Sequence, residues 1–283
     1  MWYRFEYIRP RTLDEASKIH SEEPESVFFA GGTDLLIQMK KGNLKPKYLI
    51  DLKGIDGLDR VTFKDKRLHI GSLTTLRAIE TSSIIKEKFN LLSIAAGQMG
   101  SVQIRNRGTI GGNICNASPG ADLPPPLIAL GANVKVLSPK GEKILQLKDF
   151  FKGPGETVLE RGQILTEIII PETKGKGAFI KYTIRPMEVS IMNLAVWADL
   201  TEDMRCMDIR VAVGAAGPTP MRLKTVEEYL KDRRLTEDNI REAAKYASGE
   251  IRPSVRERAR VSPDYRRHLV RILTIQALRT IMG

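Results

Sequence analysis

The sequence has few of the residues that build metal centres and covalent frameworks. It contains two cysteines, Cys115 and Cys206, and three histidines among 283 residues. An iron–sulfur cluster or a structural zinc site needs about four ligands, so these cysteines cannot hold one. Two distant cysteines also build no disulfide framework, which favours a reducing cytoplasmic location. Because no Ser-His-Asp arrangement or paired acid site stands out, we predict neither catalytic nor metal-binding residues in this chain.

Long apolar runs are missing as well. No segment approaches the roughly 20 apolar residues that a membrane-spanning helix needs. The N-terminal residues 1–5 lack the apolar centre of a signal peptide. We therefore expect no membrane span.

Aromatic residues make up only 6% of the chain, whereas its net charge is +11. A basic balance suits nucleic acid, but it also suits an anionic ligand or an acidic partner. With few aromatics and no stacking motif of an RNA-binding strand, a nucleic-acid module is the weaker interpretation. In residues 221–283 charges of both signs alternate, which is typical of a solvated or subunit-contacting face. We expect no nucleic-acid partner.

The apolar pattern predicts an α+β chain in two parts. A capping box at Thr12–Glu15 starts the first helix. The rest of the first part is predicted as strands at 27–30, 48–51, 67–71, 133–137 and 163–170 and helices at 34–40, from 74, 91–98 and 123–130, with an aperiodic segment at 103–120.

Residues 171–177 are rich in Pro, Gly and Lys and mark the predicted domain boundary. Three strands follow without an intervening helix, which favours a three-stranded antiparallel sheet. These strands are predicted at 179–182, 193–200 and 209–214, and they are followed by helices at 225–231, 236–247 and 262–282.

Two glycine-rich segments are the main candidates for ligand binding. The first, Phe29–Leu35, runs from a strand through Gly31-Gly32 into a helix. Glycine lets backbone N–H groups approach a phosphate closely. The segment matches neither the dinucleotide fingerprint nor a P-loop, and an ordinary helix-capping turn has a similar composition.

The second segment, Arg105–Pro125, is long and rich in glycine, hydroxyl and amide side chains. A loop of this length inside a compact domain is usually functional, although it can also be a structural Ω-loop. Its donors suit a diphosphate and sugar hydroxyls. Two segments of this kind in one chain favour a dinucleotide more than either does alone.

Together the segments resemble the FAD-binding medium subunit of the xanthine dehydrogenase and carbon monoxide dehydrogenase family. The resemblance is carried by the sequences at 30–35, 109–113, 117–119 and 122–124, and more weakly by those at 181–195 and 262–267. It covers almost the whole chain.

The resemblance implies a fold of the vanillyl-alcohol oxidase type. Its FAD-binding domain would span residues 1–173, with subdomains of about 1–55 and 56–173, and a C-terminal domain would span 178–283. FAD would be bound noncovalently. The implied cofactor-binding residues are Phe29, Ala30, Gly31, Gly32, Thr33, Asp34, Leu35, Thr109, Ile110, Gly111, Gly112, Asn113, Ala117, Asp122, Leu165 and Lys181.

The family also implies a role for several of these residues. The backbones of 30–35 and 109–113 would bind the diphosphate, and Asp122 would accept hydrogen bonds from hydroxyls of FAD. Leu165 would pack near the ring system, and Lys181 would approach its polar edge, where a cation stabilises negative charge on reduced flavin. A core leucine and a surface lysine are the plainer interpretations of these two.

The implied function is electron transfer within a molybdenum hydroxylase. Molybdopterin-bound molybdenum and [2Fe-2S] clusters would lie only on a large and a small partner subunit, in a dimer of heterotrimers. The cysteine-rich loop of the 4-hydroxybenzoyl-CoA reductase flavin subunit has no counterpart here. The alternative is a self-contained flavin oxidase of the same fold. Neither the substrate nor the final electron acceptor follows from the sequence.

Overall fold

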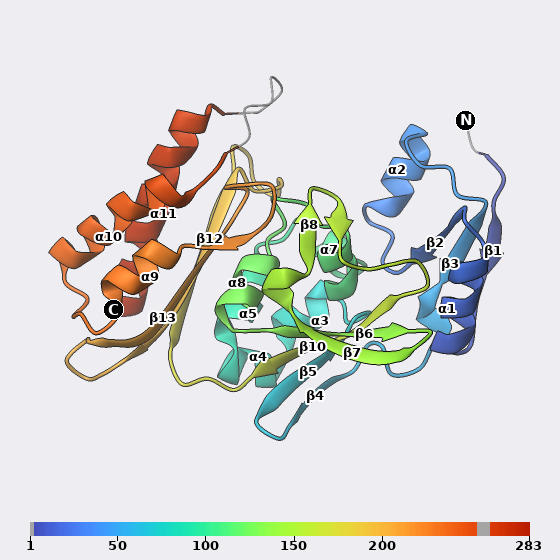
Figure 1. The fold of residues 1–283 in the computed structure, drawn as a ribbon, viewed down its shortest axis with the longest axis horizontal. Coiled ribbons are helices and arrows are strands. Elements are labelled where there is room, and N and C mark those ends of the chain that lie inside the picture. The colour runs from blue at the N-terminus through green and yellow to red at the C-terminus, as the bar shows by residue number, and fades with distance from the viewer. Residues whose placement is uncertain (1–2, 254–260) are drawn as a thin grey trace.

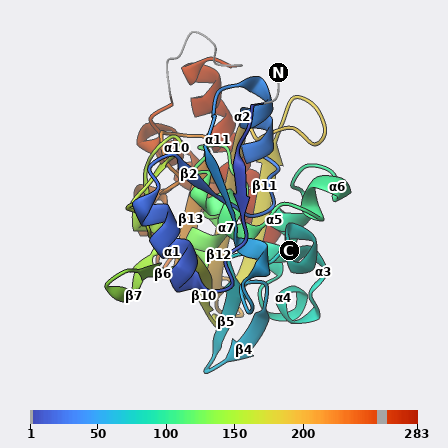
Figure 2. The same cartoon turned by 90° about the vertical axis from the view of Figure 1, so that its right-hand side faces the viewer.

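The computed structural model describes residues 3–253 and 261–283, so the first two residues of the N-terminal segment considered above lie outside it. The chain forms three units arranged along the long axis of the molecule (Figure 1). Turned by 90°, the N-terminal unit stands in front of the other two (Figure 2). None of the helices in the described ranges is long and apolar enough to cross a bilayer.

The N-terminal unit is a three-stranded parallel sheet with two helices. Strand β3 lies in the centre of the order β1-β3-β2. The Thr12 hydroxyl caps α1 by accepting from the Glu15 N–H group, as the capping box predicts. The elements are β1 (Glu6–Ile8), α1 (Leu13–Glu22), β2 (Ser26–Phe29), α2 (Leu35–Lys41), β3 (Tyr48–Asp51) and the 3-10 helix η1 (Leu52–Gly54).

The middle unit is a five-stranded antiparallel sheet with helices on one face (Figure 1). In sheet order the strands are β4 (Val61–Lys64), β5 (Arg67–Gly71), β10 (Ile164–Pro171), β6 (Asn133–Ser138) and β7 (Gly141–Gln146). The helices are α3 (Leu76–Thr81), α4 (Ser83–Lys88), α5 (Asn90–Gly97), α6 (Val102–Arg105), α7 (Ile110–Cys115) and α8 (Pro124–Ala129). Between β7 and β10 lie η2 (Leu147–Asp149), β8 (Phe151–Gly153) and β9 (Glu156–Thr157).

The C-terminal unit is an antiparallel sheet backed by three helices. Its elements are β11 (Lys176–Tyr182), β12 (Met192–Leu200), β13 (Cys206–Gly214), β14 (Met221–Arg222), α9 (Lys224–Leu230), α10 (Glu237–Glu250) and α11 (Pro263–Met282). Residues 192–198 of β12 are all buried. One side of this strand packs on α11, whereas Ala195 and Trp197 join the core of the middle unit. The C-terminal sheet is therefore wedged between two helical layers, which explains its continuous apolar run.

The structure confirms the α+β class and departs from the prediction in detail. Segment 103–120 is partly helical, because it contains most of α6 and all of α7. These helices have four and six residues, too few to show a helical period. The C-terminal sheet has a fourth strand, β14, which is only two residues long. The strands β1, β4 and β7 were not predicted, and each forms a sheet edge where alternation is weak.

His20 links α1 to the middle unit in a way that makes stability depend on pH. Its Nδ1 atom accepts a hydrogen bond from the Gly162 N–H group at 2.9 Å, and the centroid of its ring lies 4.1 Å from that of the Phe28 ring. Burial, together with the nearby Arg161, lowers the pKa of His20 to about 4. Protonation turns the accepting nitrogen into a donor and breaks this contact.

We expect His20 to make its full contribution to the free energy of unfolding above pH 6.5. This contribution is lost as the pH falls through 4, because between these values only the unfolded chain takes up the proton. The ring is partly exposed, so solvent screening reduces the effect to about 1–2 kcal/mol. Urea unfolding at pH 7 and pH 5 measures it. His20→Gln, which retains an acceptor but does not titrate, should lose less stability between these pH values than the wild type; equal losses would contradict the assignment.

Candidate functional site

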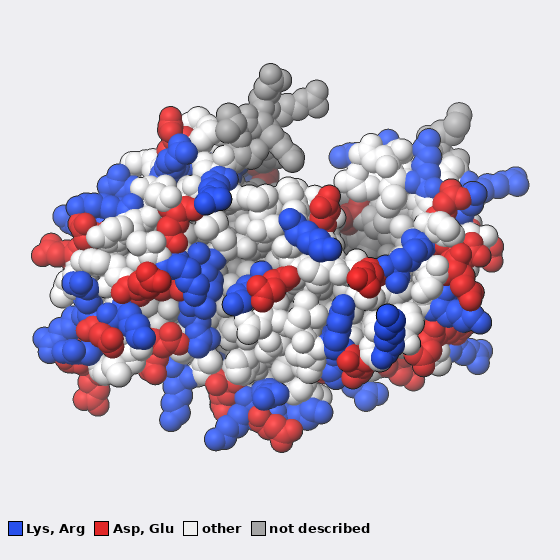
Figure 3. All heavy atoms as spheres, viewed as in Figure 1, with Lys and Arg blue, Asp and Glu red and all other residues white. Residues whose placement is uncertain are grey.

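A cavity of about 510 Å³ lies where the three units meet. Figure 3 shows the hollow between the N-terminal lobe and the rest of the molecule, and charges of both signs are interspersed over that face. Its volume falls within the range of small-molecule sites. The wall comes from the β2–α2 turn, from the stretch between α5 and α8, and from the loop between β11 and β12.

The β2–α2 turn supplies the backbone donors of this cavity. Among the described residues, no acceptor is hydrogen-bonded to the backbone N–H groups of Gly31, Gly32, Thr33, Asp34 or Leu35. All five residues line the cavity. Successive free N–H groups form a binding surface for phosphate oxygens. The arrangement therefore supports the predicted diphosphate contact of the first segment.

The two glycines of this turn are needed for different reasons. Gly32 has a φ of +74°, and a Cβ atom there would collide with the Phe29 ring. Gly31 has no such φ, but a Cβ atom there would overlap the carbonyl group of Arg107. Gly31 therefore lets the first glycine-rich segment pack directly on the second, and Gly32 sets the direction of the turn.

Phe29 supports the turn from behind. Its side chain is buried, and the Lys53 ammonium lies 3.6 Å from the centre of its ring. The same ammonium donates to the Ala30 carbonyl at 3.2 Å and to the Asp51 carboxylate at 2.6 Å. This network holds the entry to the turn in one position.

Asp34 is the N-cap residue of α2, but its side chain makes no capping hydrogen bond. Although Asp34 is exposed, desolvation by the surrounding cavity wall raises the pKa of its carboxyl group. Because no capping hydrogen bond uses it, the side chain is available to accept a hydrogen bond from a ligand hydroxyl.

The second glycine-rich segment uses its backbone differently from the first. The N–H groups of Ile110 and Gly111 donate to the carbonyls of Thr74 and Ser72, and that of Asn113 donates to Thr109. The Gly112 N–H group donates to the Thr109 hydroxyl at 3.1 Å. These four amides are thus used within the protein, which does not support the expected backbone contact of residues 110–113 with a diphosphate.

One side chain of this segment, that of Asn113, has an acceptor atom that remains available. Asn113 lines the cavity, and its Oδ1 atom is buried without a hydrogen-bond donor among the described residues. A buried acceptor without a partner costs stability, so it points to a ligand with hydroxyl or N–H donors.

Lys181 and Asp122 form a buried ion pair in the cavity wall. The Lys181 ammonium lies 2.6 Å from Asp122, and the two side chains are 7% and 6% exposed. Asp122 also accepts from Asn193 at 2.8 Å and from the Ser190 hydroxyl. Lys181 also donates to the Gln98 carbonyl at 3.1 Å. Three protein donors use this carboxylate, which therefore holds Lys181 in place. A carboxylate has about four acceptor sites, so the expected hydrogen bond from a ligand hydroxyl stays a prediction.

Most of the predicted site residues come together at the cavity. Those that line it are Ala30, Gly31, Gly32, Thr33, Asp34, Leu35, Thr109, Gly112, Asn113, Asp122 and Lys181. The others lie behind the wall or in the core, and they are Phe29, Ile110, Gly111, Ala117 and Leu165. Leu165, expected beside a ring system, is 4% exposed within the central core.

Sequence reasoning missed two parts of the wall. One is the turn after α5, with Met99 and Gly100, together with Ile104 of α6; the other is the β11–β12 loop, with Met187 and Val189. The first directly precedes the second glycine-rich segment, and Gly100 has a φ of +47°, so a lone glycine there was an available signal. Nothing in the sequence of the loop indicates a place in the wall.

Residues 3–173 match the family model described as the FAD-binding domain in molybdopterin dehydrogenase, and residues 178–281 match the CO dehydrogenase flavoprotein C-terminal domain. The chain belongs to this flavoprotein family. The family expected from the two glycine-rich segments is thereby confirmed, as is the expectation of FAD as its cofactor.

Relatives of this flavoprotein cover nearly its full length. It is 32% identical over 278 residues to the glyceraldehyde dehydrogenase medium chain of Sulfolobus acidocaldarius, with 98% of each chain covered. It is 30% identical over 273 residues to the xanthine dehydrogenase FAD-binding subunit of Escherichia coli O157:H7, with 95% of this chain and 92% of the relative covered. A carbon monoxide dehydrogenase structure from Hydrogenophaga pseudoflava has a chain that matches with a TM-score of 0.95 and 28% identity, covering 100% of this chain and 98% of that one.

The cavity of this flavoprotein fits FAD in its donors and acceptors. The free amides of residues 31–35 would hold the diphosphate, and Asn113 and Asp34 offer acceptors for hydroxyl or ring N–H groups. Lys181 is the cation in the wall that could face a ring oxygen or nitrogen. Within the described residues no group of three or more His, Cys, Asp or Glu side chains is placed to hold a metal ion.

Proposed function

We propose that this chain is the electron-transfer subunit of a multisubunit molybdenum hydroxylase. It receives electrons from iron–sulfur clusters on one partner and passes them through noncovalent FAD to a final acceptor. The observation that carries this proposal is the row of five free backbone N–H groups in the cavity wall. Together with the family match, it supports binding of the FAD diphosphate by the first glycine-rich segment.

The division into subunits is part of the proposal. A large molybdopterin subunit and a small [2Fe-2S] subunit would complete the enzyme as a dimer of heterotrimers, in the cytoplasm. The relatives called medium chain and FAD-binding subunit support a multisubunit assembly. Within this chain, residues 1–173 would bind FAD as subdomains of about 1–55 and 56–173, and residues 178–283 would form the second domain.

FAD, when bound, can accept and release electrons singly or in pairs. The residues of this chain bind it and set the charge around it. The Lys181 ammonium, held by Asp122 and Gln98, is a fixed positive charge in the wall. Such a charge stabilises electrons that arrive beside it, because the buried pair is screened little by solvent.

The cavity also supports noncovalent binding. Among the described residues that line it, Cys115 is the sole cysteine, and no histidine is present. Burial raises the pKa of the Cys115 thiol to about 12, so the nucleophilic thiolate is scarce at neutral pH. Covalent attachment, which a self-contained oxidase often uses, therefore has no suitable group here.

We expect the purified chain to bind one FAD and to release all of it on acid precipitation. Titration with FAD, followed by the absorbance of the soluble and precipitated fractions, measures both. Flavin that stays with the precipitate would contradict noncovalent binding, whereas a chain that binds no flavin would remove the whole proposal.

We further expect the FAD-loaded chain to be inactive by itself towards aldehydes, purines and carbon monoxide. Each substrate is offered with an artificial electron acceptor, and the flavin absorbance is followed over time. NADH serves as the control donor, since direct reduction of the bound flavin shows that it is accessible. Rapid bleaching by one of the three substrates would favour the self-contained oxidase.

A further inference from the structure

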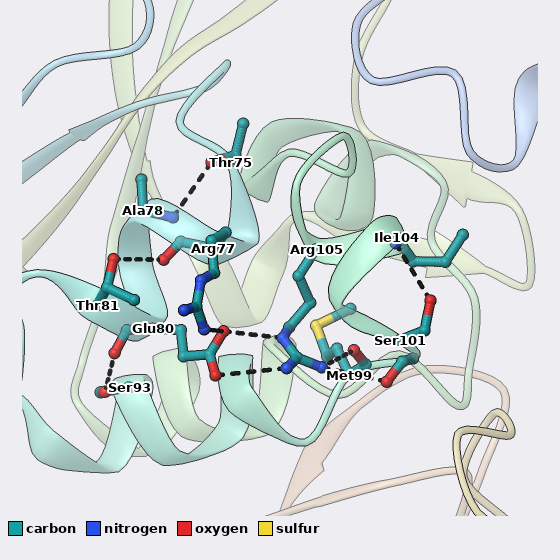
Figure 4. Close-up of polar contacts among 11 residues, drawn as sticks. Thr75, Arg77, Ala78, Glu80, Thr81, Ser93, Met99, Ser101, Ile104 and Arg105 are labelled. Carbon is teal, nitrogen blue, oxygen red and sulfur yellow. Dashed lines mark hydrogen bonds and ion pairs between the residues drawn. The ribbon is translucent and has the colours of Figure 1, made fainter.

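Arg105 is a buried arginine beside the flavin cavity, and it does not itself line the cavity. It is the last residue of α6, and its side chain is 10% exposed. Figure 4 shows its guanidinium group between Glu80 of α3 and Met99 of the turn after α5. A buried arginine is stable only where its donors are matched, so its partners show what it holds.

One side of the guanidinium group is bound to Glu80 of α3. The Arg105 Nε atom lies 2.8 Å from Glu80 Oε2, and Nη2 lies 3.4 Å from Oε1. Burial opposes ionisation of Glu80, but Arg77 and Arg105 outweigh it and lower the pKa of this carboxyl group. The Glu80 carbonyl also accepts from the Ser93 hydroxyl of α5 at 2.9 Å. Glu80 is thus a charged anchor fixed to two helices.

The other side of the guanidinium group holds backbone. Nη1 donates to the carbonyls of Met99 and Gly100 at 3.1 and 3.2 Å (Figure 4). Both residues line the cavity, and the left-handed Gly100 marks a sharp turn there. Gln98, the residue before them, has the carbonyl that accepts from the Lys181 ammonium. Arg105 therefore fixes the backbone next to one of the two groups that hold Lys181.

From these contacts we infer that Arg105 is a positioning residue for the flavin site. It ties the turn 98–100 to Glu80, and this tie places the Gln98 carbonyl and, through it, the Lys181 ammonium. The inference rests on the proposed function, because it concerns how tightly and in what surroundings FAD is held. A guanidinium group suits the role since its planar fork spans a carboxylate and two carbonyls at once, which an ammonium cannot do.

Arg77 provides a matched control. It pairs with the same Glu80 carboxylate at 2.9 Å, but its side chain is 44% exposed, and no hydrogen bond joins it to the turn. Arg77→Gln removes one guanidinium partner of Glu80 and keeps the hydrogen bonds from Arg105 to the Met99 and Gly100 carbonyls. Arg105→Gln removes the other partner and releases the turn.

The test measures the Kd for FAD of the full-length chain by titration, the visible circular dichroism of the bound flavin, and the melting temperature without FAD. We expect Arg105→Gln to weaken FAD binding at least tenfold and to alter the flavin dichroism. Arg77→Gln should stay within twofold of the wild type. Arg105→Lys, which can satisfy only some of the partners, should lie between them, at least threefold weaker than the wild type.

A double variant separates positioning from general loosening. If Arg105 acts through Lys181, then Arg105→Gln should cost clearly less FAD affinity in a Lys181→Met background than in the wild type.

An Arg105→Gln protein that melts earlier but binds FAD like the wild type would overturn the inference and leave Arg105 a structural residue. Additive effects with Lys181→Met would overturn it as well. If Arg105→Gln does not fold, Arg105→Lys decides, and wild-type affinity and dichroism in that variant overturn the inference. A wild-type chain that binds no FAD would instead refute the proposed function, so the two failures are distinguishable.

Discussion

Gly32→Val is expected to reduce FAD affinity at least a hundredfold while leaving the chain folded. Gly32 has a φ of +74°, a conformation that costs a non-glycine residue about 1–2 kcal/mol. Its new Cβ atom would also meet the Phe29 ring, which cannot withdraw because Lys53 and the buried strand hold it. The turn must therefore move, and its free N–H groups lose the alignment that a diphosphate needs. A hundredfold loss corresponds to about 2.7 kcal/mol.

Gly42→Val is the matched control for this effect. Gly42 lies at the other end of α2, has a φ of +76°, and has only the end of the Lys45 side chain, at 3.8 Å, near its missing Cβ atom. The variant carries the same backbone strain without touching the cavity. FAD titration and thermal melting are measured for both variants. If Gly42→Val weakened FAD binding as much as Gly32→Val, backbone strain alone, and not the shape of the turn, would control binding.

Gly112→Val should have a smaller effect than Gly32→Val. Gly112 does not adopt a positive φ, and the one atom close to its missing Cβ is the Thr109 hydroxyl oxygen at 2.9 Å. A rotating side chain yields more readily than an aromatic ring. Of these two glycines, Gly32 in the first segment is the one whose backbone conformation disfavours any side chain.

Lys181→Met is expected to destabilise the chain by about 3–5 kcal/mol, the usual effect of removing one partner from a buried ion pair. It leaves the Asp122 carboxylate 6% exposed with hydrogen bonds from Ser190 and Asn193 but without a counter-charge. Asp122 belongs to the segment before α8 and Lys181 to β11, so the loss also loosens the contact between the middle and C-terminal units. The free energy of unfolding in urea measures the change.

Two variants test the cause of this loss. Lys88→Met breaks a pair of similar length, 2.7 Å, whose side chains are about a third exposed, and it should lose far less stability. The double variant Lys181→Met with Asp122→Asn removes both charges and should recover more than half of the loss. If the double variant is as unstable as Lys181→Met, the loss of stability comes from lost packing and not from an unpaired charge.

The sequence alone determined the local elements that have a strong period or a strong signal. Strands such as Tyr48–Asp51 and Arg67–Gly71 were predicted to the residue, because an apolar run bounded by turn residues is a local property. The two glycine-rich segments led to the right family for a similar reason, since residue order along a turn is set by the ligand it must approach. The helices α6 and α7 escaped prediction because four and six residues contain too little of a helical period. The edge strands escaped because their apolar alternation is weak.

What the sequence could not determine was which atoms of these segments face the ligand. Hydrogen bonds to Ser72 and Thr74, more than thirty residues earlier in the chain, withdraw the second segment's amides from the cavity, while the first segment keeps its own free. The pairing of Asp122 with Lys181, 59 positions apart, likewise makes a residue expected as a hydroxyl acceptor the support of a cation as well. A donor or acceptor belongs to a site only if no closer protein group satisfies it first, and that competition is decided by tertiary packing.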